Sequence, residues 1–122
     1  MAAAKKIAVI EQGTDWSLDL VALDAAGVAI DITTGTLECQ IRSGPQGTLW
    51  AAPTCTKTTP VSGQYRLSLT NAQTRNLPTW PSGRRQGAVL QTLWGDVEWT
   101  KGDGTKVRLH ELEVRVNAEI TI

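Results

Sequence analysis

Histidine and cysteine, which often act in acid–base or nucleophilic catalysis, are rare in this chain, and their spacing matches no known catalytic arrangement. The 122-residue sequence holds one histidine, His110, and two cysteines, Cys39 and Cys55. His110 lacks a Ser or Cys partner in a known motif, and the nucleotide-binding, zinc-protease and hydrolase motifs are absent. We therefore predict no catalytic residue and assign His110 to a β-bulge or to the surface. Cys39 has the spacing of a small buried side chain, and the sequence leaves a Cys39–Cys55 disulfide open.

Metal ligands are equally scarce. No Cys-x-x-Cys pair occurs, and a site would need more than His110 to complete it. Asp15 and Asp19 share one face of a predicted strand, where they either bind a cation or, as we favour, face solvent. The residues Gly-Asp-Gly at 102–104 resemble a fragment of a calcium loop, but the other ligand positions lack acidic residues. We predict no metal and no cofactor.

Arginine and tryptophan gather in the longest irregular stretch, residues 78–91. Trp80, Arg84 and Arg85 are of the residue types enriched in binding hot spots, and flanking prolines stiffen this loop. These three are candidate partner contacts, and the alternative is a solvated loop. The arginines are too few to indicate nucleic-acid binding.

Composition places the chain among ordinary globular domains. Hydrophobic residues make up 41%, and 12 basic residues cancel 12 acidic ones. This balance favours neither nucleic acid nor an anionic membrane as partner. No apolar run reaches the roughly 20 residues of a membrane span or the 7–15 of a secretory signal. We expect one domain over residues 1–122, made in a cytosol, with residues 1–6 as a flexible arm.

Alternating apolar and polar residues predict strands throughout the chain. The expected segments are 14–23, 28–32, 36–42, 49–57, 61–70, 93–100 and 107–116, with Pro53 interrupting the fourth. One short helical turn is expected near 71–77. About seven strands with frequent turns predict an all-β protein, a single antiparallel β-sandwich.

The inward positions of two strands carry further predictions. Val97 and Trp99 share the apolar face of segment 93–100, so Trp99 is expected in the core. In the last strand, Val107 has one parity and Val114 the other. If both face inward, the phase slips near His110, and a β-bulge is the simplest cause.

The two ends of the chain are further candidates for partner contact. Segments 7–12 and 114–122 both alternate, and Ile120 and Ile122 continue the pattern to the last residue. They either add to the sheet of another chain or pair within this domain.

The order of several motifs suggests a family. The first is IEQGTDWSLDL followed by DAAGVAIDITTGTLECQIR, the second is SGQYRLSLTNAQTRNL, and the third is LWGDVEWTKGDGTKVRLHELEVRV. Together they resemble small β-sandwich proteins of tailed bacteriophages and prophages, and they are similar to the N-terminal Ig-like domain of phage baseplate proteins. The chain departs from the pattern at Gly95-Asp96, where the family often has Tyr-Asp, and at His110-Glu111.

The resemblance implies an Ig-like sandwich and a non-enzymatic virion structural protein. Its expected partners are other virion proteins, in a homo-oligomer or symmetric array, with the virion as its location and the cytoplasm of a host bacterium as its site of synthesis. We favour a tail, baseplate or fibre-adaptor component that acts through protein–protein contacts. The first alternative is a capsid decoration protein bound to the major capsid protein. The second is a glycan-binding module that uses Trp50, Trp80 and Trp94, which requires these rings to be exposed.

Overall fold

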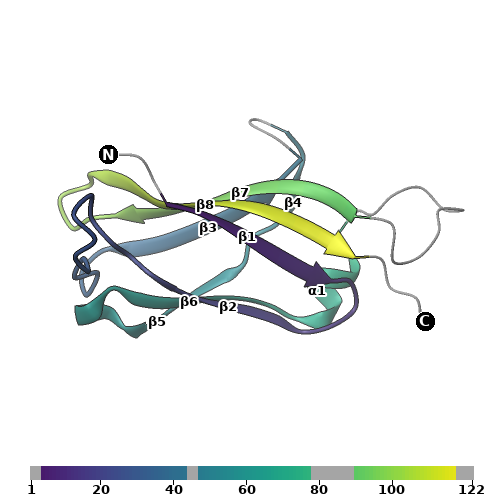
Figure 1. The fold of residues 1–122 in the computed structure, drawn as a ribbon, viewed down its shortest axis with the longest axis horizontal. Helices are drawn as coiled ribbons and strands as arrows, with labels where there is room; N and C mark the ends of the chain where they lie inside the picture. Colours follow the sequence, from purple (N-terminus) through teal and green to yellow (C-terminus); the bar gives the residue numbers. More distant parts are fainter. Residues whose placement is uncertain (1–3, 44–46, 78–89, 118–122) are drawn as a thin grey trace, which may run out of the picture.

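A computed structural model describes residues 4–43, 47–77 and 90–117 of the protein, and in these ranges the chain is almost entirely β-structure (Figure 1). The strands are β1 (Ala4–Glu11), β2 (Trp16–Val21), β3 (Thr36–Arg42), β4 (Leu49–Ala51), β5 (Thr54–Thr59), β6 (Gln64–Leu69), β7 (Leu90–Thr100) and β8 (Lys106–Asn117). A 3-10 turn, η1 (Pro60–Ser62), and one short helix, α1 (Asn71–Arg75), complete the elements. The predicted all-β class is confirmed, as is the helical turn near 71–77.

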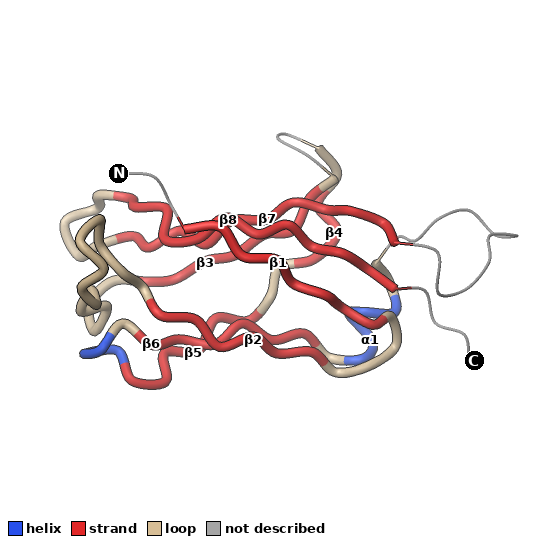
Figure 2. The backbone as a smooth tube through the Cα atoms, in the orientation of Figure 1, coloured by secondary structure: helices blue, strands red, loops and turns tan. Residues whose placement is uncertain are grey.

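The strands form two layers that face each other, as Figure 2 shows. One sheet has the order β1-β8-β7-β3-β4 and the other the order β2-β6-β5. In immunoglobulin lettering, β8, β7, β3 and β4 correspond to strands G, F, C and C′, with β1 beside G. The strands β2, β6 and β5 correspond to B, E and D. The Ig-like β-sandwich is therefore confirmed.

The first strand differs from the antiparallel arrangement that the sequence predicts. β1 pairs in parallel with β8, from Ala4 opposite His110 to Glu11 opposite Asn117. Every other strand pair among the described residues is antiparallel. Residues 4–6 thus belong to a strand and not to the flexible arm expected for 1–6, because their backbone finds partners on β8.

The core lies between the two sheets and uses the inward positions of nearly every strand. Trp99 is 6% exposed, which confirms its predicted place. Its indole N–H donates a hydrogen bond to the Thr34 carbonyl oxygen at 2.8 Å. The fully buried side chains include Ile10, Ile32, Ile41, Tyr65, Leu67, Leu77, Leu93, Val97, Leu112, Val114 and Val116.

The phase slip expected near His110 is present in β8. Val97 pairs with His110, whereas the next residue, Glu98, pairs with Arg108, so Leu109 is the extra residue of a bulge. Leu109 and His110 are both buried as a result. The bulge lets β8 present apolar side chains to the core on both sides of the slip.

Two predicted strands are organised differently. Segment 49–57 is two strands in different sheets, β4 and β5, and Pro53 lies where the chain crosses between the layers. Segment 28–32 is a loop with one isolated bridge, Leu23 to Ala29. Its backbone instead forms hydrogen bonds with the residue after β2 and with the 3-10 turn η1. The Ile30 N–H donates to the Ala22 carbonyl and the Ile32 N–H to the Pro60 carbonyl, each at 2.9 Å.

Candidate interaction surfaces

The partner contacts predicted from the sequence fall outside the described part of the chain. Trp80, Arg84, Arg85, Ile120 and Ile122 all lie there. So does most of the loop predicted at 78–91, although its last two residues belong to β7. In the described ranges, the two end strands pair with each other, which is the within-domain alternative.

The acidic residues singled out from the sequence have protein partners. Asp19 forms an exposed ion pair with Arg66, with 2.7 Å between carboxylate oxygen and guanidinium nitrogen. Asp15 accepts a hydrogen bond of 2.7 Å from the backbone N–H of Asn71. In the ranges 4–43, 47–77 and 90–117, no three His, Cys, Asp or Glu side chains gather as a metal site would need. The two aspartates therefore hold strands and turns in place.

His110 lies in the bulge, as one of the two predicted placements had it, but it is not on the surface. Its side chain is 2% exposed, and its Nδ1 is hydrogen-bonded to the hydroxyl of Tyr65 on the opposite sheet. Burial, with a smaller contribution from Lys6, lowers the pKa of His110 to about 4. The ring is therefore neutral near pH 7 and is a structural link between the layers.

The two cysteines are unpaired thiols. Cys39 is buried in β3, and Cys55 is partly buried in β5. Burial raises the pKa of Cys39 strongly and that of Cys55 to about 11. Since the thiolate is the reactive form, neither side chain is an activated nucleophile.

The outer face of the five-stranded sheet carries exposed apolar side chains, which is unusual for a solvent-facing surface. Five large ones lie on its strands: Ile7 and Val9 on β1, Leu49 and Trp50 on β4, and Trp94 on β7, between 38% and 58% exposed. We call this surface the outer face, meaning the outward side chains of β1, β8, β7, β3 and β4. It is the candidate contact surface in the described residues with the most large exposed apolar side chains.

One row of side chains crosses the outer face from edge to edge. Ile7 pairs with Glu113, Glu113 with Trp94, Trp94 with Arg42, and Arg42 with Leu49. Directly paired residues project from the same face of a sheet, so these five side chains lie side by side. The row thus reads apolar, acidic, aromatic, basic, apolar.

The charges of the outer face are held by contacts within the sheet. Arg115 approaches Glu113 at 2.6 Å, and Arg108 approaches Asp96 at 3.4 Å and Glu111 at 3.5 Å. Arg42 donates hydrogen bonds to the Gly47 carbonyl at 3.0 Å and to Gln40 Oε1 at 2.8 Å. Each of these charged side chains therefore has a partner within its own sheet.

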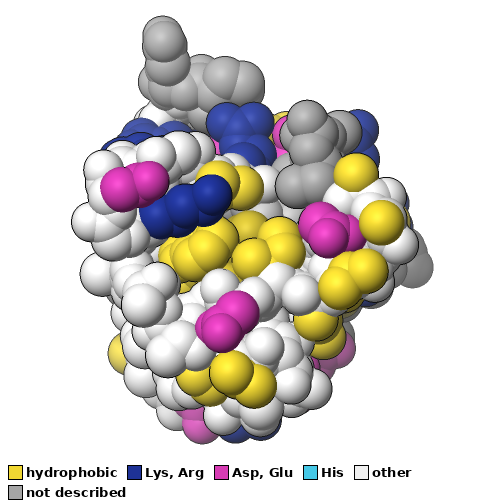
Figure 3. Space-filling model, turned by 90° about the vertical axis from the view of Figure 1, so that its left-hand side faces the viewer, with side chains coloured by type: hydrophobic (Ala, Val, Ile, Leu, Met, Phe, Trp, Pro, Cys, Tyr) yellow, Lys and Arg dark blue, Asp and Glu magenta, His cyan; other side chains and the backbone are white. Residues whose placement is uncertain are grey.

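A second apolar area lies at the end of the sandwich that carries the loop between β2 and β3. Leu23, Val28 and Val61 are exposed there, Val61 to 67%. Figure 3 shows hydrophobic side chains gathered near the middle of this end, with acidic and basic side chains around them. The area is built from loops and is less extended than the outer face.

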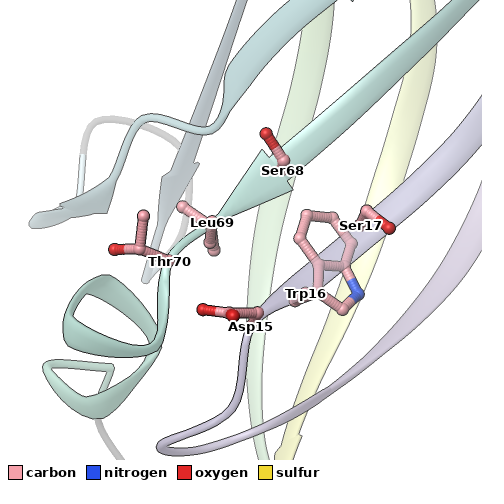
Figure 4. A pocket seen from close by; sticks show the side chains of 6 residues that line it. All are labelled: Asp15, Trp16, Ser17, Ser68, Leu69 and Thr70. Carbon is pink, nitrogen blue, oxygen red and sulfur yellow. The ribbon is translucent and has the colours of Figure 1, made fainter.

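A shallow hollow of about 350 Å³ lies at the opposite end, beside α1 (Figure 4). Its lining residues are Asp15, Trp16, Ser17, Ser68, Leu69 and Thr70. The carboxylate of Asp15 already accepts the hydrogen bond from Asn71. The hollow combines the hydroxyl groups of Ser17, Ser68 and Thr70 with the apolar side chains of Trp16 and Leu69, and we assign no ligand to it.

Sequence reasoning missed the outer face as a unit. The signal is present in the run Ile7-Ala8-Val9-Ile10, which places apolar side chains on both faces of its strand. A strand with one face in the core needs apolar side chains on that face alone. Trp94 was considered only as a glycan platform. Its place beside Arg42 and Glu113 depends on pairings between distant strands, which the sequence does not display.

The comparisons with known proteins show no family for this chain. No protein-family model matches the chain, and no curated protein matches it. Among solved structures it is similar to a chain in the crystal structure of ICOS in complex with ICOS-L and an anti ICOS-L VNAR domain. The identity is 12% and the TM-score 0.40, over 96% of this chain and 56% of that one. The chain thus spans little more than half the length of that structure. In the described residues, no helix is long and apolar enough to cross a membrane.

Proposed function

We propose that this protein is a non-enzymatic structural component of a tailed-bacteriophage virion, and that it acts through protein–protein contacts in the tail or baseplate region or as a fibre adaptor. The motif order described above supports the phage assignment. The observation that carries the contact role is the exposed apolar outer face, with Trp94 at its centre, 47% exposed. Exposed aromatic and apolar side chains next to an arginine are typical of a binding surface.

The fold and the reactive side chains agree with a binding role. Ig-like sandwiches typically present surfaces and loops to partners. The one histidine is buried against Tyr65, and both thiols have raised pKa values. Repetition of the chain in a particle would add many weak contacts into a firm attachment.

The test is the copy number of this chain in purified particles, measured by quantitative mass spectrometry against the major capsid protein. A handful to a few dozen copies, in multiples of three or six, supports the tail or baseplate role. Hundreds of copies indicate the capsid decoration alternative. Absence of the chain from particles overturns the virion assignment.

Two variants connect incorporation to the surfaces. Trp94→Glu places a charge in the outer face and is expected to reduce incorporation. Val21→Glu is the matched control, because Val21 is 39% exposed on the outward side of β2, in the other sheet.

Replacing Arg84 and Arg85 with alanine tests the loop predicted from the sequence, with little change expected in melting temperature. Equal incorporation of all variants contradicts contact through these residues.

Glycan binding is the second candidate, because Trp50 and Trp94 are 38% and 47% exposed. Exposed rings can stack on sugars, as that hypothesis requires. Titration with host cell-wall oligosaccharides, followed by tryptophan fluorescence, tests it. A saturable change that Trp94→Ala abolishes supports a glycan module, and no change for any oligosaccharide contradicts it.

A further inference from the structure

We propose that the outer face of the five-stranded sheet pairs with the same face of a second copy of this chain. The twofold axis runs parallel to the strands and passes through Trp94. This names the partner of the outer face, and it rests on the proposed role of that face as a contact surface.

The row across the sheet is the first observation. Its order is Ile7, Glu113, Trp94, Arg42, Leu49. When this order is reversed, Ile7 and Leu49 exchange places, and both are apolar. Glu113 and Arg42 also exchange places, and their charges are opposite. A surface that changes in this way on reversal is complementary to itself.

The symmetry of a face-to-face dimer performs this reversal. A twofold axis parallel to the strands inverts the strand order of the second copy and keeps each row at its own level. Glu113 then meets Arg42 of the second copy, Ile7 meets Leu49, and the two Trp94 rings meet at the axis. An axis along the row would instead oppose Glu113 to Glu113 and Arg42 to Arg42, which like-charge repulsion disfavours.

The next row is compatible with the same axis. It contains Lys5, Glu111, Asp96 and Gln40 in strand order. Reversal places Glu111 opposite Gln40, whose amide can donate a hydrogen bond. Asp96 comes opposite its own copy, but Arg108 approaches each Asp96 at 3.4 Å within its own chain. Arg108 also approaches Glu111 at 3.5 Å, so each carboxylate of this row has a cationic neighbour in its own chain.

The size of the face is sufficient for a stable interface. Strands lie about 4.8 Å apart and rise about 3.4 Å per residue, and β1, β8, β7, β3 and β4 contain 8, 12, 11, 7 and 3 residues. The resulting plane of roughly 700 Å² is close to the roughly 800 Å² that each partner buries in a standard interface. Arg42 is already fixed by its bonds to Gly47 and Gln40.

The first experiment measures self-association of the full chain by sedimentation equilibrium. We expect a concentration-dependent dimer, and we expect Trp94→Glu to raise its Kd at least about 100-fold. Val21→Glu, on the other sheet, is expected to leave the Kd unchanged. A measurement at about 500 µM detects a dimer whose Kd is about millimolar or lower. A wild-type chain that is still monomeric at this concentration overturns the proposal.

A charge exchange tests the axis itself. Arg42→Glu and Glu113→Arg are each expected to weaken the dimer about tenfold or more, because each opposes like charges across the interface. The double variant restores opposite charges and is expected to return to within about threefold of the wild-type Kd. A double variant at least as weak as the weaker single variant overturns this register. Should Glu113→Arg fail to fold, Leu49→Glu replaces it, with weakening expected and an unchanged Kd counting against the proposal.

The outcomes separate this pairing from the proposed function. A dimer that fails to enter particles overturns the virion role and leaves the pairing. A monomer that enters particles through the outer face overturns the pairing and leaves the role. A monomer whose Trp94 fluorescence responds to an oligosaccharide also overturns the pairing and assigns the face to a glycan.

Discussion

The link between His110 and Tyr65 joins the two sheets through a single buried hydrogen bond. A buried polar side chain is stabilising only while its partner is present and its charge state suits the core. Here both conditions hold at neutral pH, because the low pKa keeps the imidazole uncharged. The stability of the fold is therefore expected to respond to acid through this one residue.

The predicted response is a loss of stability between about pH 6.5 and pH 4. His110 titrates near 4 in the folded protein and near 6.5 when unfolded, so in this range the unfolded chain binds the extra proton. The free energy of unfolding is thus expected to fall by about 2–3 kcal/mol as the pH drops. Urea unfolding at about pH 7 and about pH 4.5 measures it.

The control for this prediction is His110→Gln, which removes the titrating group. Asp31 and Asp103 also have lowered pKa values, from hydrogen bonds to Thr33 and Thr105, and lose their contribution only at lower pH. The variant is expected to be less stable at neutral pH but to show a smaller loss on acidification. The same loss in wild type and variant contradicts the assignment to His110.

Trp99 and Trp94 lie on the same strand and give a direct contrast in burial. Trp99 is 6% exposed and donates a hydrogen bond to Thr34, whereas Trp94 is 47% exposed. Trp99→Ala is expected to lower the free energy of unfolding by roughly 3–5 kcal/mol. Trp94→Ala is expected to lower it by less than about 1 kcal/mol. Denaturant titration measures both, and a loss below about 1 kcal/mol for Trp99→Ala contradicts its core placement.

The short helix α1, which directly follows β6, holds the turn between β1 and β2 in place. Thr74 is fully buried, and its hydroxyl donates to the Thr14 carbonyl at 2.7 Å and accepts from the Gly13 N–H at 3.0 Å. A capping box between Thr70 and Gln73 starts the helix. The short helix therefore depends on long-range contacts and not on its own length.

Thr74→Val tests this dependence with almost no change in volume. It removes the hydroxyl and leaves the Gly13 N–H and the Thr14 carbonyl unpaired, so a loss of about 1–3 kcal/mol is expected in the free energy of unfolding. Thr58→Val is the control, because Thr58 is exposed on β5. Its change is expected to stay within about 0.5 kcal/mol. Equal effects of the two substitutions in thermal unfolding would contradict the role of Thr74.

Sequence periodicity was sufficient for most elements and insufficient for how they join. The buried side chains of Tyr65, Leu67 and Leu69 alternate cleanly within the predicted segment 61–70, and the bulge beside His110 is where the sequence predicts it. The sequence places Pro53 within one interrupted segment, because periodicity carries no information about which sheet a strand enters. The pairing of β1 with β8 and the row through Trp94 depend on contacts between distant strands, so local patterns do not contain them.

The buried thiol of Cys39 can react only after the two sheets separate, which gives a global measurement of stability. Cys39 is buried in the five-stranded sheet and Cys55 is partly buried in the three-stranded one. With the pKa of Cys55 raised to about 11, little thiolate exists at neutral pH. A thiol reagent at about pH 8 is expected to label Cys55 about 100-fold more slowly than a cysteine in the urea-unfolded chain.

Cys39 is expected to react more slowly still, because its exposure requires the two sheets to separate. Mass spectrometry of a Cys55→Ser variant isolates this reaction. The ratio of its labelling rate to that of the unfolded chain then gives the free energy of opening, which should equal the value from denaturant unfolding, since both report the same loss of the layered core. Labelling of Cys39 as fast as in the unfolded chain would contradict a closed sandwich. A ratio that grows from about pH 7 to about pH 5 would connect this opening to protonation of His110.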